Sequence, residues 1–476
     1  MRIFVPATIS RRAFLAGVTG LVAAARIRGA AAEDSKPLKE FKLTATAGRV
    51  AFVGKPHSDT DVWCYDGGVP GPEIRLRQGE PARIVVQNNL TEGTTVHWHG
   101  IRLPIAMDGV PGISQPLIRP GDRFIYEFTP PDAGTFWYHP HADSLQQLGR
   151  GMAGALIVEE PQPLPVDRDV LWMLADWRLT ARAQIASGFG NGMEASMSGR
   201  IGNTVTVNGV VSREEPVRAG ERIRLRLVNC SLARIMALRF EGHHPLVTAI
   251  DGQPCDPQEP DGGRILLGPA MRVDLILDMQ GDPGRRYRVI DDFYEGLSYW
   301  LTRLAYDERQ PLRGHAGDPP LVLPRNPLPE PDPTTVERHE LILQGGMMGG
   351  GSMMGMGGMM GMGHGASWAI NGMSMTGDGQ ASMPPLLTLQ SGRSYVLTLR
   401  NDTAWWHPMH LHGHSFRVLS RNGVSAPRRQ WADTVLLPPK ETVDIAFVAG
   451  SPGDWMLHCH VTDHQVSGMM TVLRIT

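Results

Sequence analysis

Long apolar runs, charge imbalance and helical periodicity are all scarce in this sequence of 476 residues. Beyond the N-terminus, no stretch approaches the ~18–20 consecutive apolar residues that a membrane-spanning helix needs. The formal net charge is only −2 and no long basic run occurs, which argues against nucleic acid or an anionic membrane surface as a partner. Apolar residues hardly recur at a 3.6-residue spacing, so a helical fold is not expected. Small molecules or metal ions remain as partners.

Cysteine is also scarce, with four residues in the whole chain. Cys459 stands between two histidines, and the other three, Cys64, Cys230 and Cys255, cannot pair completely because their number is odd. A disulfide between Cys230 and Cys255 and a set of buried free thiols are both compatible with the sequence. The sequence leaves these two alternatives open.

The N-terminus differs from the rest of the chain. Arg11 and Arg12 precede an apolar run over residues 13–25, and small residues follow at 29–32. Paired arginines, a modest apolar run and a small-residue cleavage region are typical of a twin-arginine signal peptide. A membrane anchor is the alternative, but the apolar run is too short for a span. We therefore expect a signal peptide over residues 1–32, export to the periplasm and a mature protein without a membrane span.

The remainder of the chain is rich in short runs of β-branched and aromatic residues, separated by glycine and proline. Such runs predict the strands of an all-β fold, a sandwich or a barrel. A succession of turn, strand, turn, strand and asparagine occurs three times, at residues 67–90, 206–231 and 369–402. A repeat at this long spacing suits three tandem domains of one fold. The predicted domains are residues 36–160, 161–330 and 335–476.

One segment of the third domain breaks the strand pattern. Residues 345–365 consist almost entirely of glycine and methionine. Such glycine density cannot form a stable helix or a packed layer, because ordering glycine costs too much conformational entropy. We expect a mobile surface loop. Its methionines are Met347, Met348, Met353, Met354, Met356, Met359, Met360 and Met362.

The most informative motif lies near the C-terminus, where Cys459 stands between His458 and His460 and is followed by His464 and Met469. Thiolate, imidazole and thioether are the soft and borderline donors that copper prefers. On an extended strand the cysteine points away from its two neighbours, so one tripeptide can serve two metal centres. The cysteine, His464 and Met469 need only a second histidine to form a blue-copper electron-transfer site.

Three further histidine clusters supply the missing partners. On an extended backbone, a His-x-His pair places both imidazoles on one face, within reach of two adjacent metals. A single pair of this kind is more often an accident than a site. Four clusters that hold ten of the 17 histidines, none in the middle domain, argue against coincidence. The three further clusters are His97 and His99; His139 and His141; and His407, His410 and His412.

With these four motifs the chain resembles the multicopper oxidases, of the three-domain laccase-like type, over essentially its whole mature sequence. The resemblance implies three cupredoxin-like Greek-key domains and four copper ions, with the middle domain as a spacer that holds no ligand. It makes His407, Cys459, His464 and axial Met469 the type 1 ligands, His97 and His410 the type 2 ligands, and His99, His139, His141, His412, His458 and His460 the ligands of the type 3 pair.

The family's chemistry follows from this division. Each electron enters at the type 1 copper and passes from Cys459 through His458 or His460, and four electrons reduce dioxygen to two waters. Asp108 matches a position where related bacterial enzymes carry an acidic residue, which implies a proton relay. A turn residue before Gly109 is the alternative reading of Asp108.

The methionine-rich segment bears on the substrate, because thioethers suit Cu(I). Its placement resembles the insert of periplasmic cuprous oxidases of bacterial copper tolerance, and a low-complexity linker is the alternative. Those enzymes carry Asp and Met where this chain has Thr403 and Trp405, and Trp405 with Trp406 would instead suit an aromatic pocket, as in laccases.

Three functions are compatible with these features of the sequence. The sequence favours a monomeric oxidase of Cu(I) and phenols that acts in copper homeostasis. The alternatives are a laccase for organic phenols and a copper-binding or scaffold protein without turnover.

Overall fold

The computed structural model describes residues 38–211, 214–313, 319–332, 334, 336–348, 367–377 and 384–476. The predicted signal peptide lies outside these residues, as do six of the eight methionines in the Met/Gly-rich segment: Met353, Met354, Met356, Met359, Met360 and Met362. Leu38–Thr476 forms one compact unit. None of the described helices has the length and apolar character needed to cross a membrane.

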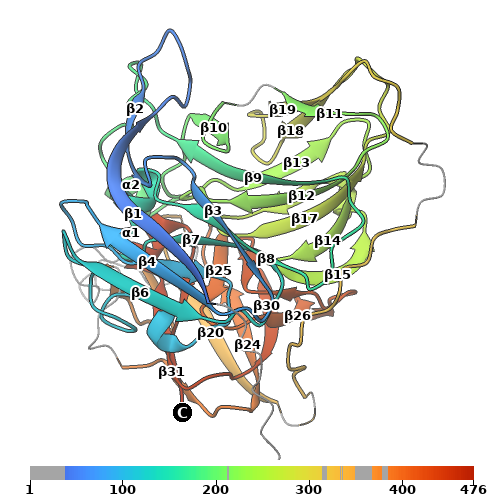
Figure 1. Ribbon diagram of the computed structural model, residues 1–476. Coiled ribbons are helices and arrows are strands. Elements are labelled where there is room, and N and C mark those ends of the chain that lie inside the picture. Colours follow the sequence, from blue (N-terminus) through green and yellow to red (C-terminus); the bar gives the residue numbers. More distant parts are fainter. Residues whose placement is uncertain are drawn as a thin grey trace, which may run out of the picture. The chain divides into compact units, whose positions relative to one another are not determined.

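Strands and loops make up almost all of the described chain, which confirms the predicted all-β class (Figure 1). Helical elements are short: α1 (Ser144–Gly149), α2 (Gly192–Ala195), α3 (Thr462–Val466), η1 (Ile105–Met107) and η2 (Asp261–Gly263). Below, "first", "second" and "third domain" denote the predicted ranges 36–160, 161–330 and 335–476. The boundaries themselves stay predictions.

The first domain consists of two four-stranded sheets. One sheet contains, in spatial order, β2 (Thr60–Tyr65), β1 (Lys39–Val50), β4 (Ala82–Asn88) and β6 (Arg123–Phe128). The other contains β3 (Gly71–Arg77), β8 (Gly154–Glu159), β7 (Gly134–His139) and β5 (His97–His99). Buried and partly exposed residues alternate along β4, as expected when one face of a strand lines a core. Trp98 of β5 and Tyr126 of β6 pack in that core.

The second domain has a six-stranded and a five-stranded sheet. The larger contains β10 (Thr204–Val207), β9 (Arg168–Trp177), β12 (Arg222–Asn229), β17 (Arg272–Asp278), β14 (Leu246–Ile250) and β15 (Gln253–Gln258). The smaller contains β11 (Glu215–Val217), β19 (Tyr299–Tyr306), β18 (Arg286–Asp291), β13 (Met236–Phe240) and β16 (Ile265–Leu267). Strand β7 of the first domain lies beside β12 and β17.

The third domain repeats the arrangement. One sheet contains β21 (Trp368–Ile370), β20 (Glu337–Gly345), β24 (Ser394–Asn401), β30 (Thr442–Val448), β26 (Phe416–Arg421) and β27 (Val424–Ser425), with β28 (Trp431–Ala432) paired to β26. The second contains β23 (Leu387–Leu389), β33 (Met470–Ile475), β31 (Gly453–Cys459), β25 (His407–Leu411) and β29 (Thr434–Leu437). A two-stranded sheet joins β22 (Met375–Thr376) to β32 (Ser467–Gly468).

One pairing pattern recurs in all three domains. The opening strand of each, β1, β9 or β20, pairs parallel with β4, β12 or β24, and that partner pairs antiparallel with β6, β17 or β30. The opening strand also pairs antiparallel with β2, β10 or β21. The sequence pattern that occurs three times therefore corresponds to a strand order that also occurs three times.

The two alternatives for the cysteines are decided by the structure. Cys64, Cys230 and Cys255 are buried free thiols, so no disulfide joins Cys230 to Cys255. Burial raises the pKa of Cys255 to about 11 and raises that of Cys230 further. These thiols are protonated and act as small core side chains.

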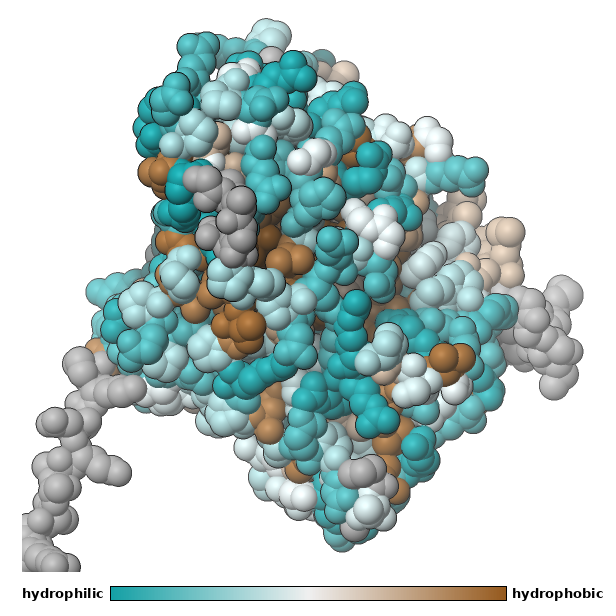
Figure 2. All heavy atoms as spheres, turned by 90° about the vertical axis from the view of Figure 1, so that its right-hand side faces the viewer, coloured by the Kyte–Doolittle hydropathy of each residue, from teal (hydrophilic) through white to brown (hydrophobic). Residues whose placement is uncertain are grey.

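The surface gives less guidance than the interior. The face drawn in Figure 2 is mostly hydrophilic, with hydrophobic side chains in separate patches. The chemically unusual residues, namely the clustered histidines and Cys459, are buried instead. The candidate functional residues therefore lie inside the molecule.

Candidate metal centre

Three side chains of the third domain form what we call the Cys459 group: His407 at the start of β25, Cys459 at the end of β31 and His464 in α3. The Cys459 sulfur is 3.5 Å from Nδ1 of His407 and 3.6 Å from Nδ1 of His464, and the two nitrogens are 3.1 Å apart. All three residues are fully buried. Their donor atoms are close enough together to hold one metal ion.

Hydrogen bonds on the outer side orient both imidazoles of this group. Nε2 of His407 is 2.8 Å from the hydroxyl of Thr403, and Nε2 of His464 is 2.7 Å from the carbonyl oxygen of Met197. A ring whose Nε2 donates outward keeps a lone pair on Nδ1. Both lone pairs therefore face the Cys459 sulfur, as a metal ion would require.

Burial sets the protonation of the Cys459 group. It lowers the pKa of His464 to about 3 and raises the pKa of the Cys459 thiol. The imidazoles are thus in their neutral, metal-binding form, whereas the thiol gives up its proton when a metal binds. Met469, the predicted fourth ligand, is buried, and its backbone accepts from Cys459 N at 3.0 Å and donates to the His464 carbonyl at 2.9 Å.

The remaining eight predicted ligands form a second group, here called the histidine cluster. Its members are His97, His99, His139, His141, His410, His412, His458 and His460. Strand register brings them together, because β5 pairs with β7 so that His97 faces His139, and β25 pairs with β31 so that His410 faces His458. The cluster thus joins the first domain to the third.

Donor atoms within the cluster converge in threes. The sets of three are His97, His99 and His410; His97, His141 and His412; and His99, His139 and His460. His458 Nε2 is 3.1 Å from His412 Nε2, which adds the eighth ring to the second set. Among the described residues, these buried ring nitrogens have no hydrogen-bond partner: His97 Nε2, His99 Nδ1, His410 Nε2, His460 Nδ1 and both nitrogens of His141.

Unpartnered buried nitrogens are costly, and native structures rarely keep them without a ligand. Here they lie side by side in neutral rings, since burial lowers the pKa of His99, His141 and His460 well below the ordinary value. Neutral imidazole rings are the commonest metal ligands in proteins. Together with the Cys459 group, the chain therefore offers donors that suit copper at both places.

Asp108 lies beside the histidine cluster. Its carboxylate oxygens are 2.8 Å from Nδ1 of His412 and 3.3 Å from Nδ1 of His97, and its carbonyl oxygen accepts from His97 Nδ1 at 2.7 Å. Burial alone would raise the pKa of Asp108, but the two imidazoles lower it below the ordinary value. Asp108 also ends η1 before Gly109, where φ is +82° and a Cβ would lie 1.9 Å from the Val96 carbonyl oxygen. Both alternatives for Asp108, a proton relay and a turn residue before Gly109, thus have a structural basis.

A second carboxylate at the cluster, Asp433, was missed by sequence reasoning. It lies 3.3 Å from Nε2 of His99, and its carbonyl oxygen accepts from Nδ1 of His410 at 2.9 Å. No motif marks Asp433, because it is far in sequence from every histidine that it contacts. His414 was also overlooked, but backbone groups engage both of its ring nitrogens, so it is a structural residue.

The second domain covers the Cys459 group with the segment around α2. The carbonyl of Ala195 accepts from the indole of Trp368 at 2.6 Å, and Trp368 packs on the His464 ring. The carbonyl of Ser196 accepts from Met347 N at 2.7 Å, and the Met347 carbonyl accepts from the Trp405 indole at 2.8 Å. The start of the Met/Gly-rich segment is therefore attached beside the group.

The two tryptophans that precede His407 differ in their surroundings. Trp405 is tied to Met347 as described, whereas the Trp406 ring lies 5.4 Å from that of Phe293 in an edge-to-face contact. Phe293 belongs to the second domain. An aromatic contact between the second and third domains thus lies one residue before the predicted ligand His407.

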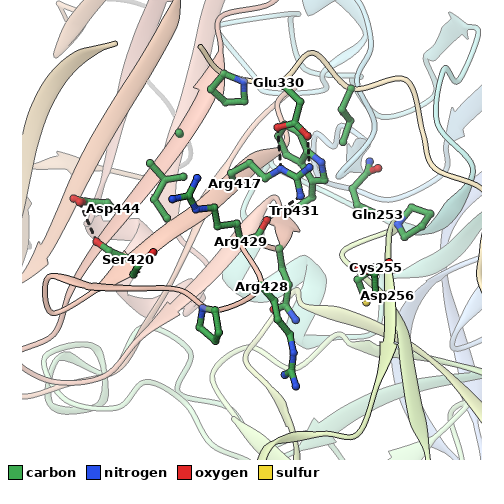
Figure 3. Close-up of a pocket in the computed structure, with 18 of the residues that line it drawn as sticks. Gln253, Cys255, Asp256, Glu330, Arg417, Ser420, Arg428, Arg429, Trp431 and Asp444 are labelled. Atoms are coloured by element: carbon green, nitrogen blue, oxygen red, sulfur yellow. Dashed lines mark hydrogen bonds and ion pairs between the residues drawn. The ribbon is translucent and has the colours of Figure 1, made fainter. Parts of the chain in front are cut away.

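A cavity of about 1200 Å³ lies elsewhere, between the second and third domains (Figure 3). Arginines and carboxylates line it and are largely paired with one another, as in Arg417 with Glu330 and Arg325 with Asp256. Trp431, two residues before Asp433, forms part of its wall. None of the predicted metal ligands lines this cavity.

Comparison with known proteins agrees with this geometry. Three family models described as "Multicopper oxidase" match residues 45–163, 168–297 and 359–476. A crystal structure of a multi-copper oxidase from Pseudomonas thermotolerans superposes with a TM-score of 0.82 at 34% identity, over 93% of this chain and all of that one.

Two curated relatives carry more specific names. Laccase-2 of Botryotinia fuckeliana is 28% identical, over 85% of this chain and 77% of its own length. Copper resistance protein A of Escherichia coli is 26% identical, over 98% of this chain and 99% of its own length. The structural match identifies the three β domains as cupredoxin-like. The chain therefore belongs to the multicopper oxidase family and is an oxidoreductase that uses oxygen.

Proposed function

We propose that this protein couples the one-electron oxidation of Cu(I), and secondarily of phenols, to the four-electron reduction of dioxygen to water. The proposed setting is copper homeostasis or tolerance in the periplasm, reached through the twin-arginine signal over residues 1–32. The proposed cofactors are four copper ions: one type 1, one type 2 and two type 3. The donor atoms described above suit this set, with two centres that share one tripeptide.

The ligand assignment follows the groups of donors. His407, Cys459 and His464, with Met469 axial, would hold type 1 copper, and His97 with His410 would hold type 2 copper. The three-atom sets support a division of the six other histidines into His99, His139 and His460 on one type 3 ion and His141, His412 and His458 on the other. Bound copper would supply the one-electron redox chemistry and the binding of dioxygen.

The chain itself connects the two centres. Cys459 belongs to one proposed centre, and its sequence neighbours His458 and His460 belong to the other. The backbone between adjacent residues is therefore a covalent path from one centre to the other. Nδ1 of His458 also donates to the Cys459 carbonyl oxygen at 2.9 Å, which adds a hydrogen-bonded path beside the covalent one. Burial of all three side chains keeps water out of this connection.

Asp108 is proposed as the proton relay of the histidine cluster. Its ionised carboxylate accepts from Nδ1 of His412 and lies near Nδ1 of His97, so it can hold a proton next to two ligands. A positioned acid or base of this kind accelerates a reaction by about 10²- to 10⁴-fold.

One observation carries the preference for Cu(I). Met347 is hydrogen-bonded through its backbone to Ser196 and Trp405, adjacent to Met197, whose carbonyl accepts from the type 1 ligand His464. The Met/Gly-rich segment therefore starts next to the proposed point of electron entry, and Met347 and Met348 expose 50% and 80% of their surface. Thioethers at this place suit the capture of Cu(I). The relative named copper resistance protein A supports a role in copper handling.

A laccase that acts mainly on phenols is the second candidate. The edge-to-face pair that Trp406, one residue before His407, forms with Phe293 favours an aromatic substrate, and one relative is named a laccase. A copper-binding or scaffold protein without turnover is disfavoured, because neither centre lacks a donor.

Oxygen uptake with Cu(I) and with a phenol distinguishes the two candidates. The variant deletes residues 349–366, whose flanks are already close because Gly346 N donates to the Ser367 carbonyl at 3.0 Å. A control keeps the length but replaces the six methionines beyond Met348 in this segment with serine. We expect both variants to lose about tenfold or more in Cu(I) oxidation, because soft ligands are gone, and to keep or raise phenol oxidation. Unchanged Cu(I) rates in both variants would exclude a role for the six methionines beyond Met348 and favour the laccase.

A further inference from the structure

The second domain contributes no predicted copper ligand, yet one of its side chains reaches both other domains. Arg272, at the start of β17, is fully buried. Its two terminal nitrogens donate to the two carboxylate oxygens of Asp433 in the third domain, at 2.8 and 2.5 Å. Its Nε donates to the carbonyl of Thr135 in the first domain at 3.2 Å. The bidentate arrangement fixes both the distance and the plane of the Asp433 carboxylate.

The opposite side of that carboxylate faces the histidine cluster. Oδ1 of Asp433 is 3.3 Å from Nε2 of His99 and 3.4 Å from Nδ1 of His410. The hydroxyl of Thr434 donates to the same oxygen at 2.8 Å and lies 3.2 Å from Nδ1 of His410. The ring nitrogens that remain for a metal, Nδ1 of His99 and Nε2 of His410, have no other partner among the described residues. Nε2 of His99 is also 3.3 Å from the Thr434 hydroxyl, and Nδ1 of His410 donates to the backbone carbonyl of Asp433 at 2.9 Å. The orientation of both rings therefore depends on where Asp433 and Thr434 are held.

A second residue of the middle domain, Asp251, also holds the segment that carries Asp433. Arg272, Asp251 and Asp433 together are called the brace below. The Asp251 carboxylate accepts from the backbone N–H groups of Arg272, Asp433 and Thr434 at 2.9, 3.2 and 3.0 Å. Asp251 has φ of +49°, as aspartate before glycine commonly has in the two-residue turn of a hairpin such as that between β14 and β15. The same carboxylate thus ties the turn that bears it to Arg272 and to the segment that carries Asp433.

The backbone leaves room for this brace. Gly100, next to His99, has φ of +86°, and a Cβ there would lie 2.2 Å from a terminal nitrogen of Arg272 and 2.5 Å from Asp433. Any side chain at position 100 would displace the ion pair. The absence of a side chain at this position is therefore part of the contact between domains.

The segment that carries Asp433 also contacts an arginine at the wall of the cavity between the second and third domains. There, Figure 3 shows Arg417 between Trp431 and Glu330: its guanidinium lies 4.2 Å from the Trp431 ring centroid and pairs with Glu330. Arg417 thus holds the segment from outside, without contact to the cluster, whereas Arg272 holds it from inside.

We propose that Arg272 is a positioning residue for the metal site: the second domain sets the orientation of His99 and His410 through Asp433. In this view the second domain is more than a spacer, because it determines the geometry of a centre whose ligands all come from the other two domains. The inference rests on the proposed assignment of these histidines as copper ligands. Loss of a hydrogen-bonding partner behind a metal ligand typically costs 10- to 100-fold in metal affinity or activity.

A purely structural role for Arg272 is the competing explanation, and Arg224 provides a matched control. Arg224 is also a buried arginine of the second domain with two carboxylate partners, Glu160 at 2.8 Å and Asp274 at 2.7 Å. Within the described part of the chain, Arg224 contacts neither the histidine cluster nor Asp433. Its replacement removes comparable ion pairs without touching the brace.

The test compares Arg272→Lys, Arg272→Gln and Arg224→Gln with the wild type after copper loading. The measurements are copper per chain, the electron paramagnetic resonance spectrum of type 2 copper, the blue absorption band, steady-state kinetics and thermal unfolding of the copper-free protein. Both Arg272 variants should lose or alter the type 2 signal and lower kcat about tenfold or more, with the blue band and the KM of the reductant unchanged. Arg224→Gln should lower the unfolding temperature but keep the wild-type spectrum and kcat.

Lysine keeps the charge of Arg272 but not its two parallel hydrogen bonds, so Arg272→Lys decides the question if Arg272→Gln fails to fold. Wild-type spectra and kcat in Arg272→Lys would overturn the inference. So would an Arg224→Gln variant with the same spectral change. Wild-type protein that takes up no copper at the cluster would instead overturn the proposed function, and this inference with it.

Discussion

The Cys459 group and the histidine cluster are built in different ways. All predicted ligands of the Cys459 group come from the third domain, and two of them lie five residues apart, at Cys459 and His464. The histidine cluster takes four rings from the first domain and four from the third, and a buried ion pair from the second domain braces it. One centre is thus largely local, whereas the other exists only in the assembled chain.

The groups that orient the ligands also differ in charge between the two sites. The Cys459 group is oriented by two neutral hydrogen bonds, from His407 to Thr403 and from His464 to Met197. The cluster is backed by two buried carboxylates: Asp433 pairs with the guanidinium of Arg272, and Asp108 accepts a hydrogen bond from Nδ1 of His412. Breaking one member of a buried charge pair leaves an uncompensated charge and is strongly destabilising. Changes behind the cluster should therefore affect the protein more widely than changes behind the Cys459 group.

The largest expected effect is the separation of the two centres by Cys459→Ser. Serine lacks the soft anionic donor, so the blue absorption near ~600 nm should vanish and turnover should fall to background. The cluster should keep its copper, because its donors are untouched. Copper per chain and the absorption spectrum measure this outcome. Simultaneous loss of copper from both centres would contradict the division into two sites.

A second, smaller effect is expected from Asp108→Asn. Asparagine fits the turn before Gly109 but cannot serve as a base, so oxygen consumption should drop about 10²-fold. Reduction of the blue band by substrate without oxygen should stay at the wild-type rate, because the Cys459 group is unchanged. Stopped-flow absorption and oxygen uptake, measured on the same preparation, separate these steps. Full activity in this variant would leave Asp108 with its turn role only.

The smallest effect should follow Thr403→Val, which removes the hydroxyl behind His407 while it keeps the side-chain shape. We expect about tenfold weaker copper binding in the Cys459 group and a shifted blue band, with the cluster spectrum unchanged. Thr398→Val is the control, since Thr398, in strand β24 five residues before Thr403, donates to Asp444 at 2.7 Å and not to His407. Copper titration monitored by absorption measures both variants. Equal affinities in the two would show that Thr403 does not orient the ligand.

The sequence predicted the donors of the Cys459 group and of the cluster because their spacing is short. His-x-His on an extended strand puts two rings on one face, and strands β5 and β31 have that form, with Trp98 and Cys459 turned into the cores. The all-β class and the threefold strand order were also accessible, since they depend on local β patterns and turns. The roles of Asp108 and of the methionines beyond Met348 stay predictions.

Other features could not be predicted from spacing. Arg272, Asp251 and Asp433 meet across about 160 and 180 residues of sequence, and nothing near them in the chain marks a site. The partition of histidines into sets and the cover of His464 by Met197 depend equally on how the domains pack. Contacts of this kind are decided by which surfaces become buried together, and only the folded chain contains that information.

The sequence by itself therefore determined which atoms can bind metal, because donor type and strand geometry are local properties. The tertiary structure decided which donors share a site and what orients them. Buried polar groups must find partners, and in this protein those partners come from distant parts of the chain. The second domain, which contains none of the four histidine motifs, supplies two such partners, Arg272 and Asp251.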